Sequence, residues 1–76
     1  MATELTPRML AQSRVIAKGK RIRDVLRLVA DYGGTASQWV KKSSPLFEIS
    51  EVTYEYHWYE RTGIGRMDVK RKQVQR

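Results

Sequence analysis

The hydrophobic period changes once along this chain, and that change limits its fold more than any other feature. Between residues 22 and 30, apolar side chains recur every three or four positions, which is the spacing of one helical stripe. From residue 46 to residue 74 the period is two, and β-branched and aromatic residues are frequent. Helices followed by antiparallel strands predict an α+β domain, with two N-terminal helices and a short third helical turn packed on a small antiparallel β-sheet.

The helical half carries recognisable start and stop signals. Thr6-Pro7 is typical of an N-cap followed by proline at the first helical position, and we expect a first helix from there to about Lys18. A second helix ends at Tyr32-Gly33-Gly34, because glycine is the usual left-handed residue after a helix. Residues 35–38 have the capping-box pattern, which predicts one or two short helical turns that carry Trp39 and Val40. The expected apolar stripe of the second helix consists of Ile22, Val25, Leu26, Val29 and Ala30.

The second half of the chain predicts strands. A polar loop over residues 41–45 is expected to lead into a short strand at residues 46–49. A longer strand at residues 52–59 follows, and a turn at residues 61–65 returns the chain along residues 66–74. The C-terminal part is therefore expected to be a hairpin with one additional strand.

Alternation divides the hairpin residues between two faces. The face expected to pack on the helices holds Val52, Tyr54, Tyr56, Trp58, Met67 and Val69. The opposite face holds Glu55, His57, Tyr59, Arg66, Asp68, Lys70 and Lys72. If Glu60 pairs with Gly65, the register places Tyr59 beside Arg66, His57 beside Asp68, and Glu55 beside Lys70. Trp39 and Trp58 have apolar neighbours and are expected in the core.

Composition limits the kind of partner and the kind of site. The chain has 76 residues, no cysteine, one histidine and a formal charge of +7, which predicts one domain over residues 1–76 with residues 1–5 disordered. Disulfides and Cys-based zinc sites are excluded, and neither a metal nor another cofactor is expected. The apolar stretches are too short to cross a bilayer, so no membrane segment is expected. A basic excess spread along the chain predicts a polyanionic partner, either a nucleic acid or an acidic protein.

The polar hairpin face has the groups that metal-free RNA cleavage requires. That reaction needs a base for the ribose 2′-OH, an acid for the leaving 5′ oxygen, and cations for the phosphoryl oxygens. His57 and Glu55 are the acid–base candidates, and Lys70, with Arg66 or Lys72, is the candidate for stabilising the transition state. Candidate nucleic-acid contacts are Tyr59, Lys72, Lys41, Lys42 and Arg71.

Two simpler interpretations remain open. The His57, Glu55 and Lys70 side chains can be ordinary cross-strand pairs on a solvated face. Three helical segments followed by a basic hairpin are also compatible with a non-enzymatic winged-helix domain that binds DNA or RNA, although residues 35–42 make a short recognition helix.

Several short motifs resemble a known group of proteins. They are Tyr32-Gly33-Gly34, then residues 39–44 (WVKKSS), then His57-Trp58-Tyr59-Glu60 followed by Thr62-Gly63 and a lysine-rich strand. Over roughly residues 21–72, the chain is similar to the C-terminal toxin modules of bacterial polymorphic toxins of the contact-dependent inhibition and Rhs type. Many such modules resemble the small ribonuclease group of barnase, colicin-type nucleases and RelE-type toxins.

The resemblance implies a function and a setting. It implies a ribonuclease toxin that cleaves tRNA or rRNA without a metal, is carried as part of a larger secreted or cell-surface protein, and acts in the cytoplasm of a competing bacterium. It also implies an acidic immunity protein as partner. His57 would then be the leading catalytic residue, followed by Lys70 and Glu55, with Glu60 and Arg66 in support. The single histidine and the small number of expected strands depart from that group.

Overall fold

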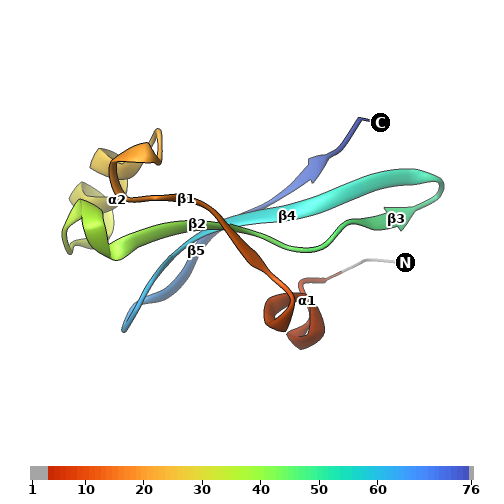
Figure 1. The fold of residues 1–76 in the computed structure, drawn as a ribbon, viewed down its shortest axis with the longest axis horizontal. Helices are drawn as coiled ribbons and strands as arrows, with labels where there is room; N and C mark the ends of the chain where they lie inside the picture. Colours follow the sequence, from red (N-terminus) through yellow and green to blue (C-terminus); the bar gives the residue numbers. More distant parts are fainter. Residues whose placement is uncertain (1–3, 76) are drawn as a thin grey trace.

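Five strands form one antiparallel sheet, with two short α-helices beside it (Figure 1). The computed structural model describes residues 4–75, and its longest dimension is 39 Å. In chain order the elements are α1 (Pro7–Ala11), β1 (Arg14–Lys18), the 3-10 turn η1 (Gly19–Arg21), α2 (Val25–Tyr32), the 3-10 turn η2 (Ala36–Gln38), β2 (Trp39–Ser43), β3 (Phe47–Ile49), β4 (Val52–Arg61) and β5 (Gly65–Gln73). The predicted α+β class is confirmed.

Strand β4 is the central strand of the sheet and pairs with three other strands. It is ten residues long and therefore extends for about 33 Å, most of the length of the molecule. Strand β5 pairs along one edge of β4, while β2 and β3 pair with successive parts of the other edge, and β1 pairs with the outer side of β2. Both faces of β4 are consequently available to position side chains.

Two residues of the predicted disordered N-terminal segment are described. Residues 4 and 5 belong to no helix or strand, whereas the part of the predicted disordered segment that covers residues 1–3 lies outside the described residues. Among the helices within residues 4–75, none has the length and apolar character that a membrane span requires.

The predicted first helix is wrong in its second half. Thr6 caps α1 by accepting a hydrogen bond from the Met9 amide, as expected, but the helix ends at Ala11 and residues 14–18 form β1. The Ser13 hydroxyl donates to the Leu10 carbonyl, a local bond that competes with continued helix. The following Val15 and Ile16 are β-branched and therefore favour a strand.

The predicted polar loop at residues 41–45 is also largely wrong, because residues 39–43 form β2. For the same reason, the prediction that a helical turn carries Trp39 and Val40 is wrong, and the 3-10 turn ends at Gln38. This strand lies between β1 and β4 and has both of its edges paired. Its two lysines extend to opposite faces, and the backbone pairing on each side outweighs their weak preference for strands. The remaining predictions of short strand, long strand, turn and return strand are confirmed within two residues.

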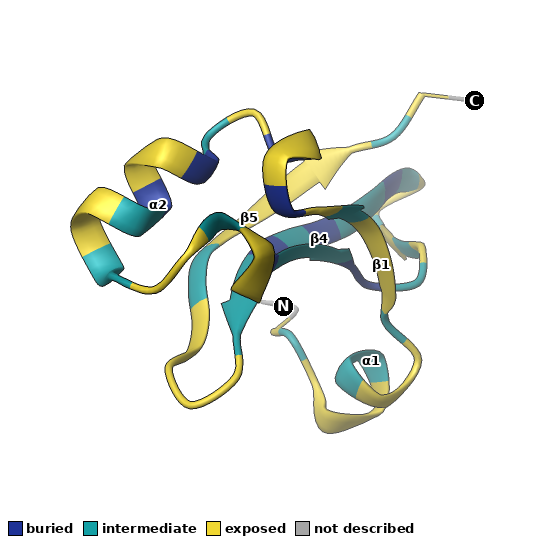
Figure 2. Cartoon of the chain, turned by 60° about the vertical axis from the view of Figure 1, so that its left-hand side comes forward, coloured by how far each residue is buried: buried dark blue, intermediate teal, exposed yellow. Residues whose placement is uncertain are grey.

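The hydrophobic core lies between α2 and one end of the sheet. Figure 2 shows that the buried residues of α2 face the sheet. The core consists of Ile22, Val25, Leu28 and Trp39, with Val29, Tyr32, Tyr59 and Met67 packed against it. The predicted stripe is wrong at Leu26, which is 80% exposed, and at Ala30, which is also exposed, and it omits Leu28, which is fully buried. The helix starts at Val25, so its inward face follows the series 25, 28, 29 and 32.

The face of β4 that packs on the helix is the opposite of the predicted one. Tyr59 joins the core beneath α2, whereas Trp58 projects to the other side of the sheet. Trp58 is nevertheless only 1% exposed and Trp39 is 0% exposed, which confirms both as buried. The Trp58 indole N–H donates to Glu60 at 3.2 Å on that second face.

The predicted hairpin register is wrong by one residue at the turn and by one more beyond it. Arg61, rather than Glu60, pairs with Gly65, and an irregularity between His57 and Tyr59 then adds a residue to β5. This β-bulge contains Asp68, whose φ of 53° lies in the left-handed region. The resulting pairs are Tyr59 with Met67, His57 with Lys70, and Glu55 with Lys72. Because the two shifts add to two residues, Lys70 and Lys72 stay on the His57 face.

Candidate active site

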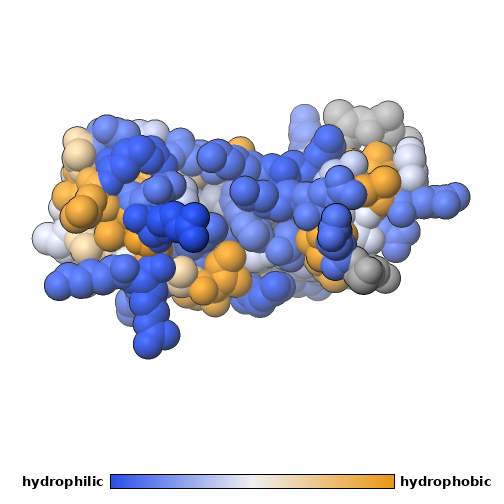
Figure 3. Space-filling model, turned by 90° about the horizontal axis from the view of Figure 1, so that it is seen from above, coloured by the Kyte–Doolittle hydropathy of each residue, from blue (hydrophilic) through white to orange (hydrophobic). Residues whose placement is uncertain are grey.

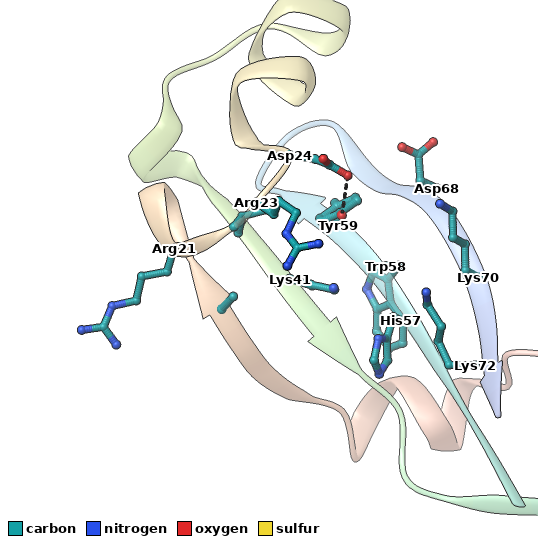
Figure 4. A pocket seen from close by; sticks show the side chains of 12 residues that line it. Arg21, Arg23, Asp24, Lys41, His57, Trp58, Tyr59, Asp68, Lys70 and Lys72 are labelled. Atoms are coloured by element: carbon teal, nitrogen blue, oxygen red, sulfur yellow. Dashed lines mark hydrogen bonds between the residues drawn. The ribbon is translucent and has the colours of Figure 1, made fainter. Parts of the chain in front are cut away.

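A groove runs along the His57 face of β4, next to the helical core. It has a volume of about 480 Å³ and lies between the segment that links β1 to α2, strand β2 and strand β5 (Figure 4). The charged and titratable residues that line it are Arg21, Arg23, Asp24, Lys41, His57, Tyr59, Asp68, Lys70 and Lys72. It therefore joins residues from four separate parts of the chain.

His57 and Glu55 form a hydrogen-bonded pair at this groove. His57 Nε2 lies 2.8 Å from Glu55 Oε1, and the two side chains are 18% and 15% exposed. The other Glu55 oxygen lies 3.8 Å from Arg14 on β1. His57 Nδ1 is enclosed by protein atoms and has no hydrogen-bond partner among the described residues. The carboxylate is thus placed to orient the imidazole.

Two lysines stand across from this pair on β5. Lys70 is the direct cross-strand partner of His57, and Lys72 is the partner of Glu55. Figure 4 shows both side chains along the groove, with the Lys72 amine directed towards the space beside His57 and the Lys70 amine directed towards Asp68. Within the part of the chain described, neither ammonium lies within 4.0 Å of a carboxylate. Both remain available to bind an anion.

A second group of cations lies on the other side of the groove. The Arg23 guanidinium and the Lys41 amine are directed towards the same space, whereas the Arg21 side chain extends away from it (Figure 4). Lys41 also lies over the ring of Tyr59, with its Nζ 5.8 Å from the ring centroid. Arg23 is not among the residues predicted from the sequence, because its approach to Lys41 depends on how the segment before α2 packs beside β2.

Tyr59 is held at the boundary between the groove and the core. Its hydroxyl donates to Asp24 Oδ2 at 3.4 Å. Burial raises the pKa of Tyr59, and the nearby Asp24 carboxylate raises it further. Tyr59 therefore remains a neutral phenol at physiological pH, and it serves as a hydrogen-bond donor.

The bulge residue Asp68 is clamped to α2. Arg27 donates to its Oδ2 at 2.8 Å, and the Tyr32 hydroxyl donates to its Oδ1 at 3.2 Å. The hydrogen bond from Arg27 is the main reason why the pKa of Asp68 is lowered from its usual value. The clamp fixes the bulge immediately before Lys70, and so it helps to set where that lysine stands relative to His57.

The contacts of Asp68 with α2 should make the stability of the fold depend on pH. Because the pKa of Asp68 is lowered in the folded state, its contribution to stability is fully present above the ordinary carboxylate pKa and is lost as pH falls through the lowered value. Asp68→Asn should therefore lower the thermal unfolding midpoint by a few degrees at pH 7. Asparagine tolerates positive φ, so the backbone is not a second cause. Melting curves of both proteins should converge in strong acid, and a pH-independent difference would contradict the clamp.

Three candidate residues lie away from the groove. Arg66 is the cross-strand partner of Glu60, and Lys42 contacts that same carboxylate at 3.1 Å, on the Trp58 side of the sheet. Burial alone would raise the pKa of Glu60, but the hydrogen bonds from Trp58 and Lys42 outweigh it and lower the pKa. Arg71 lies over the ring of Tyr54 at 4.6 Å. The structure thus brings together His57, Glu55, Lys70, Lys72, Tyr59 and Lys41, but not Arg66, Lys42 or Arg71.

The surface and the donor groups indicate which ligands this site suits. Within residues 4–75, no three histidine or acidic side chains lie close enough together to hold a metal ion. Hydrophilic residues cover most of the face seen in Figure 3, with the apolar ones in separate small patches. The groove is therefore a cationic cleft that contains one imidazole, which is bonded to a carboxylate outside the lining.

Comparison with known proteins identifies no relative of this chain. A scan against protein-family models, a search of curated proteins and a search of solved structures each return no match.

Proposed function

We propose that this protein is an endoribonuclease that needs no metal ion and cleaves RNA by attack of the ribose 2′-OH. One observation carries the proposal: His57, held by Glu55, lines a groove together with its cross-strand partner Lys70 and with Lys72, and the cations of this groove lack carboxylate partners among the described residues. A phosphodiester bound to these lysines would lie beside the one imidazole of the chain. Proton transfer and charge stabilisation can then act on the same phosphate.

The chemistry follows from these positions. His57 takes the proton of the 2′-OH while the 2′ oxygen forms its bond to phosphorus, and Glu55 orients the imidazolium and stabilises its charge. The bond from phosphorus to the 5′ oxygen breaks, and the proton passes from the imidazole to that oxygen. The products are a 2′,3′-cyclic phosphate and a 5′-hydroxyl end. Lys70 and Lys72 stabilise the charge that develops on the phosphoryl oxygens.

The free groove must adjust for this reaction. Nε2 is bonded to Glu55 and Nδ1 is enclosed, so the imidazole has to turn or exchange its hydrogen bond when RNA binds. Catalytic hydrogen bonds commonly reach their final geometry only in the substrate complex.

The same observation favours a second candidate function, a non-enzymatic domain that binds DNA or RNA. In that case the His57–Glu55 bond is purely structural and only the cations act on the ligand. A winged-helix version of this candidate would lack a full recognition helix, because residues 36–38 form a single 3-10 turn.

Incubation of the purified protein with tRNA and rRNA in EDTA distinguishes the two candidates. The ribonuclease proposal expects cleavage and 2′,3′-cyclic phosphate ends, while a DNA strand of the same sequence binds without being cut. Binding of both strands with no cleavage of either would leave only the second candidate.

A matched pair of substitutions tests the role of the lysine across from His57. Lys70→Ala should reduce cleavage by about 10²–10³-fold, the usual effect of removing one donor to the transition-state charge. Arg66→Ala removes the same charge from the same strand but faces Glu60, and it should change the rate by less than about threefold. Single-turnover rates on one RNA measure both. Equal losses would show that only net charge matters.

The proposal extends to the setting implied by the motifs. A basic ribonuclease module of this kind would act as a toxin delivered by a larger secreted or cell-surface protein into another bacterium. An acidic immunity protein that covers the Lys70–Lys72 side of the groove would neutralise it by charge complementarity and by excluding RNA.

A further inference from the structure

We propose that the groove binds at least two phosphates of one oligonucleotide. Arg23 and Lys41 hold one phosphate, and the adjacent phosphate lies beside His57. That the phosphate beside His57 is the one that reacts rests on the proposed ribonuclease function. The substrate class is then a polynucleotide segment recognised through its backbone. A mononucleotide or a single isolated phosphate would fill only part of the site.

Charge balance is the first argument. Two carboxylates line the groove together with four cations whose side chains stay along it, Arg23, Lys41, Lys70 and Lys72; Arg21 borders the groove, but its side chain extends away (Figure 4). One carboxylate, Asp68, is bonded to Arg27, and the other, Asp24, accepts from Tyr59 and lies 3.9 Å from the same arginine. One phosphodiester carries a single negative charge, which is less than this lining can neutralise. Further phosphates would complete the balance.

The positions of the cations are the second argument. Lys41 belongs to β2, the partner of Tyr59, and Lys70 belongs to β5, the partner of His57. These two strands flank β4 on opposite sides, so their backbones are about 10 Å apart, twice the spacing of neighbouring strands. Arg23 approaches on the Lys41 side (Figure 4). The cations therefore form two groups, one on each side of the β4 row that contains His57.

The aromatic residues supply the third argument, because they leave little surface for base recognition. Trp58 is 1% exposed, and Tyr59 is held by Asp24 and covered on one side by Lys41. Stacking on a base requires an open ring face. Among the residues described, the groove presents several cations to phosphates but few open aromatic ring faces to bases. This predicts a weak preference for nucleotide sequence.

Binding of two small ligands tests the inference without any cleavage. Deoxythymidine 3′,5′-bisphosphate and deoxythymidine 5′-diphosphate both carry two phosphates, but only the first spaces them across a sugar. Isothermal titration at fixed salt should show about tenfold tighter binding of the 3′,5′-bisphosphate, the effect of one additional charge-assisted contact. Arg23→Gln and Lys41→Gln should each reduce that preference to about twofold or less.

Arg21→Gln is the matched control, because it removes the same charge two residues from Arg23 on a side chain that extends away from the groove (Figure 4). It should weaken both ligands slightly and leave the preference intact. Equal affinity of the native protein for the two ligands, or equal effects of Arg21→Gln and Arg23→Gln, would overturn the two-phosphate site. A native protein that prefers the 3′,5′-bisphosphate but cleaves no RNA would instead contradict only the ribonuclease proposal.

Discussion

Replacement of His57 by alanine is expected to reduce RNA cleavage by about 10²–10⁴-fold, the usual contribution of a positioned acid–base group. It is the one imidazole in the chain, and its cross-strand partner is Lys70. Single-turnover rates on a defined RNA measure the loss. Affinity for a DNA strand of the same sequence should change by less than about threefold, because the groove cations that bind phosphate remain.

The fold should survive this substitution. His57 contributes one side-chain hydrogen bond, to Glu55, and it is not part of the helical core. An unchanged circular dichroism spectrum would separate lost chemistry from lost structure. Glu55→Gln is the companion variant, because it keeps the shape of the side chain and removes the charge that stabilises the imidazolium. Cleavage by His57→Ala at the native rate would show that another group performs the proton transfer.

Replacement of Trp39 by alanine is expected to lower the free energy of unfolding by about 3–5 kcal/mol, as for other large buried aromatic residues. Trp39 is 0% exposed, packs with Ile22 and Leu28, and donates its indole N–H to the Gly33 carbonyl at 3.1 Å. A domain of this length has a total stability of only about 4–11 kcal/mol. The variant should therefore lose a large part of the stability of the domain.

Leu26→Ala is the control for this second prediction. Leu26 lies on α2 but is 80% exposed, so its removal should change the unfolding free energy by less than about 0.5 kcal/mol. Urea titration followed by tryptophan fluorescence and far-ultraviolet circular dichroism measures both variants. A loss of less than about 1 kcal/mol for Trp39→Ala would mean that the core is not centred between α2 and β2.

Local pattern was sufficient for much of this fold. The alternation from residue 52 onwards identified β4 and β5, and it placed Glu55, His57 and Tyr59 on one face. Side-chain direction in a strand depends only on parity, so it can be read without knowing the partner strand. The capping box at Thr35 and Gln38 likewise requires only four consecutive residues, and the structure contains it.

Features set by contacts between distant segments could not be read in this way. Strands β1 and β2 form because each provides an edge for the other, and neither has a strong strand pattern of its own. The bulge at Asp68 depends on Arg27 and Tyr32, which lie on α2 far earlier in the chain. Without that bulge, the pairing of Arg61 with Gly65 would bring Val69, and not Lys70, across from His57. The approach of Arg23 to Lys41 is tertiary for the same reason.

The most direct test of the central claim is an NMR measurement on the single imidazole. In tag-free, ¹⁵N-labelled protein, long-range ¹H–¹⁵N correlations report the two ring nitrogens of His57 without assignment ambiguity, because the chain contains one histidine. Titration with an uncleavable 2′-deoxy oligonucleotide should shift both nitrogen signals and broaden or move the signal of Nε2 as its bond to Glu55 is exchanged. Saturating binding that leaves both ring nitrogens unchanged would contradict a phosphodiester held beside His57.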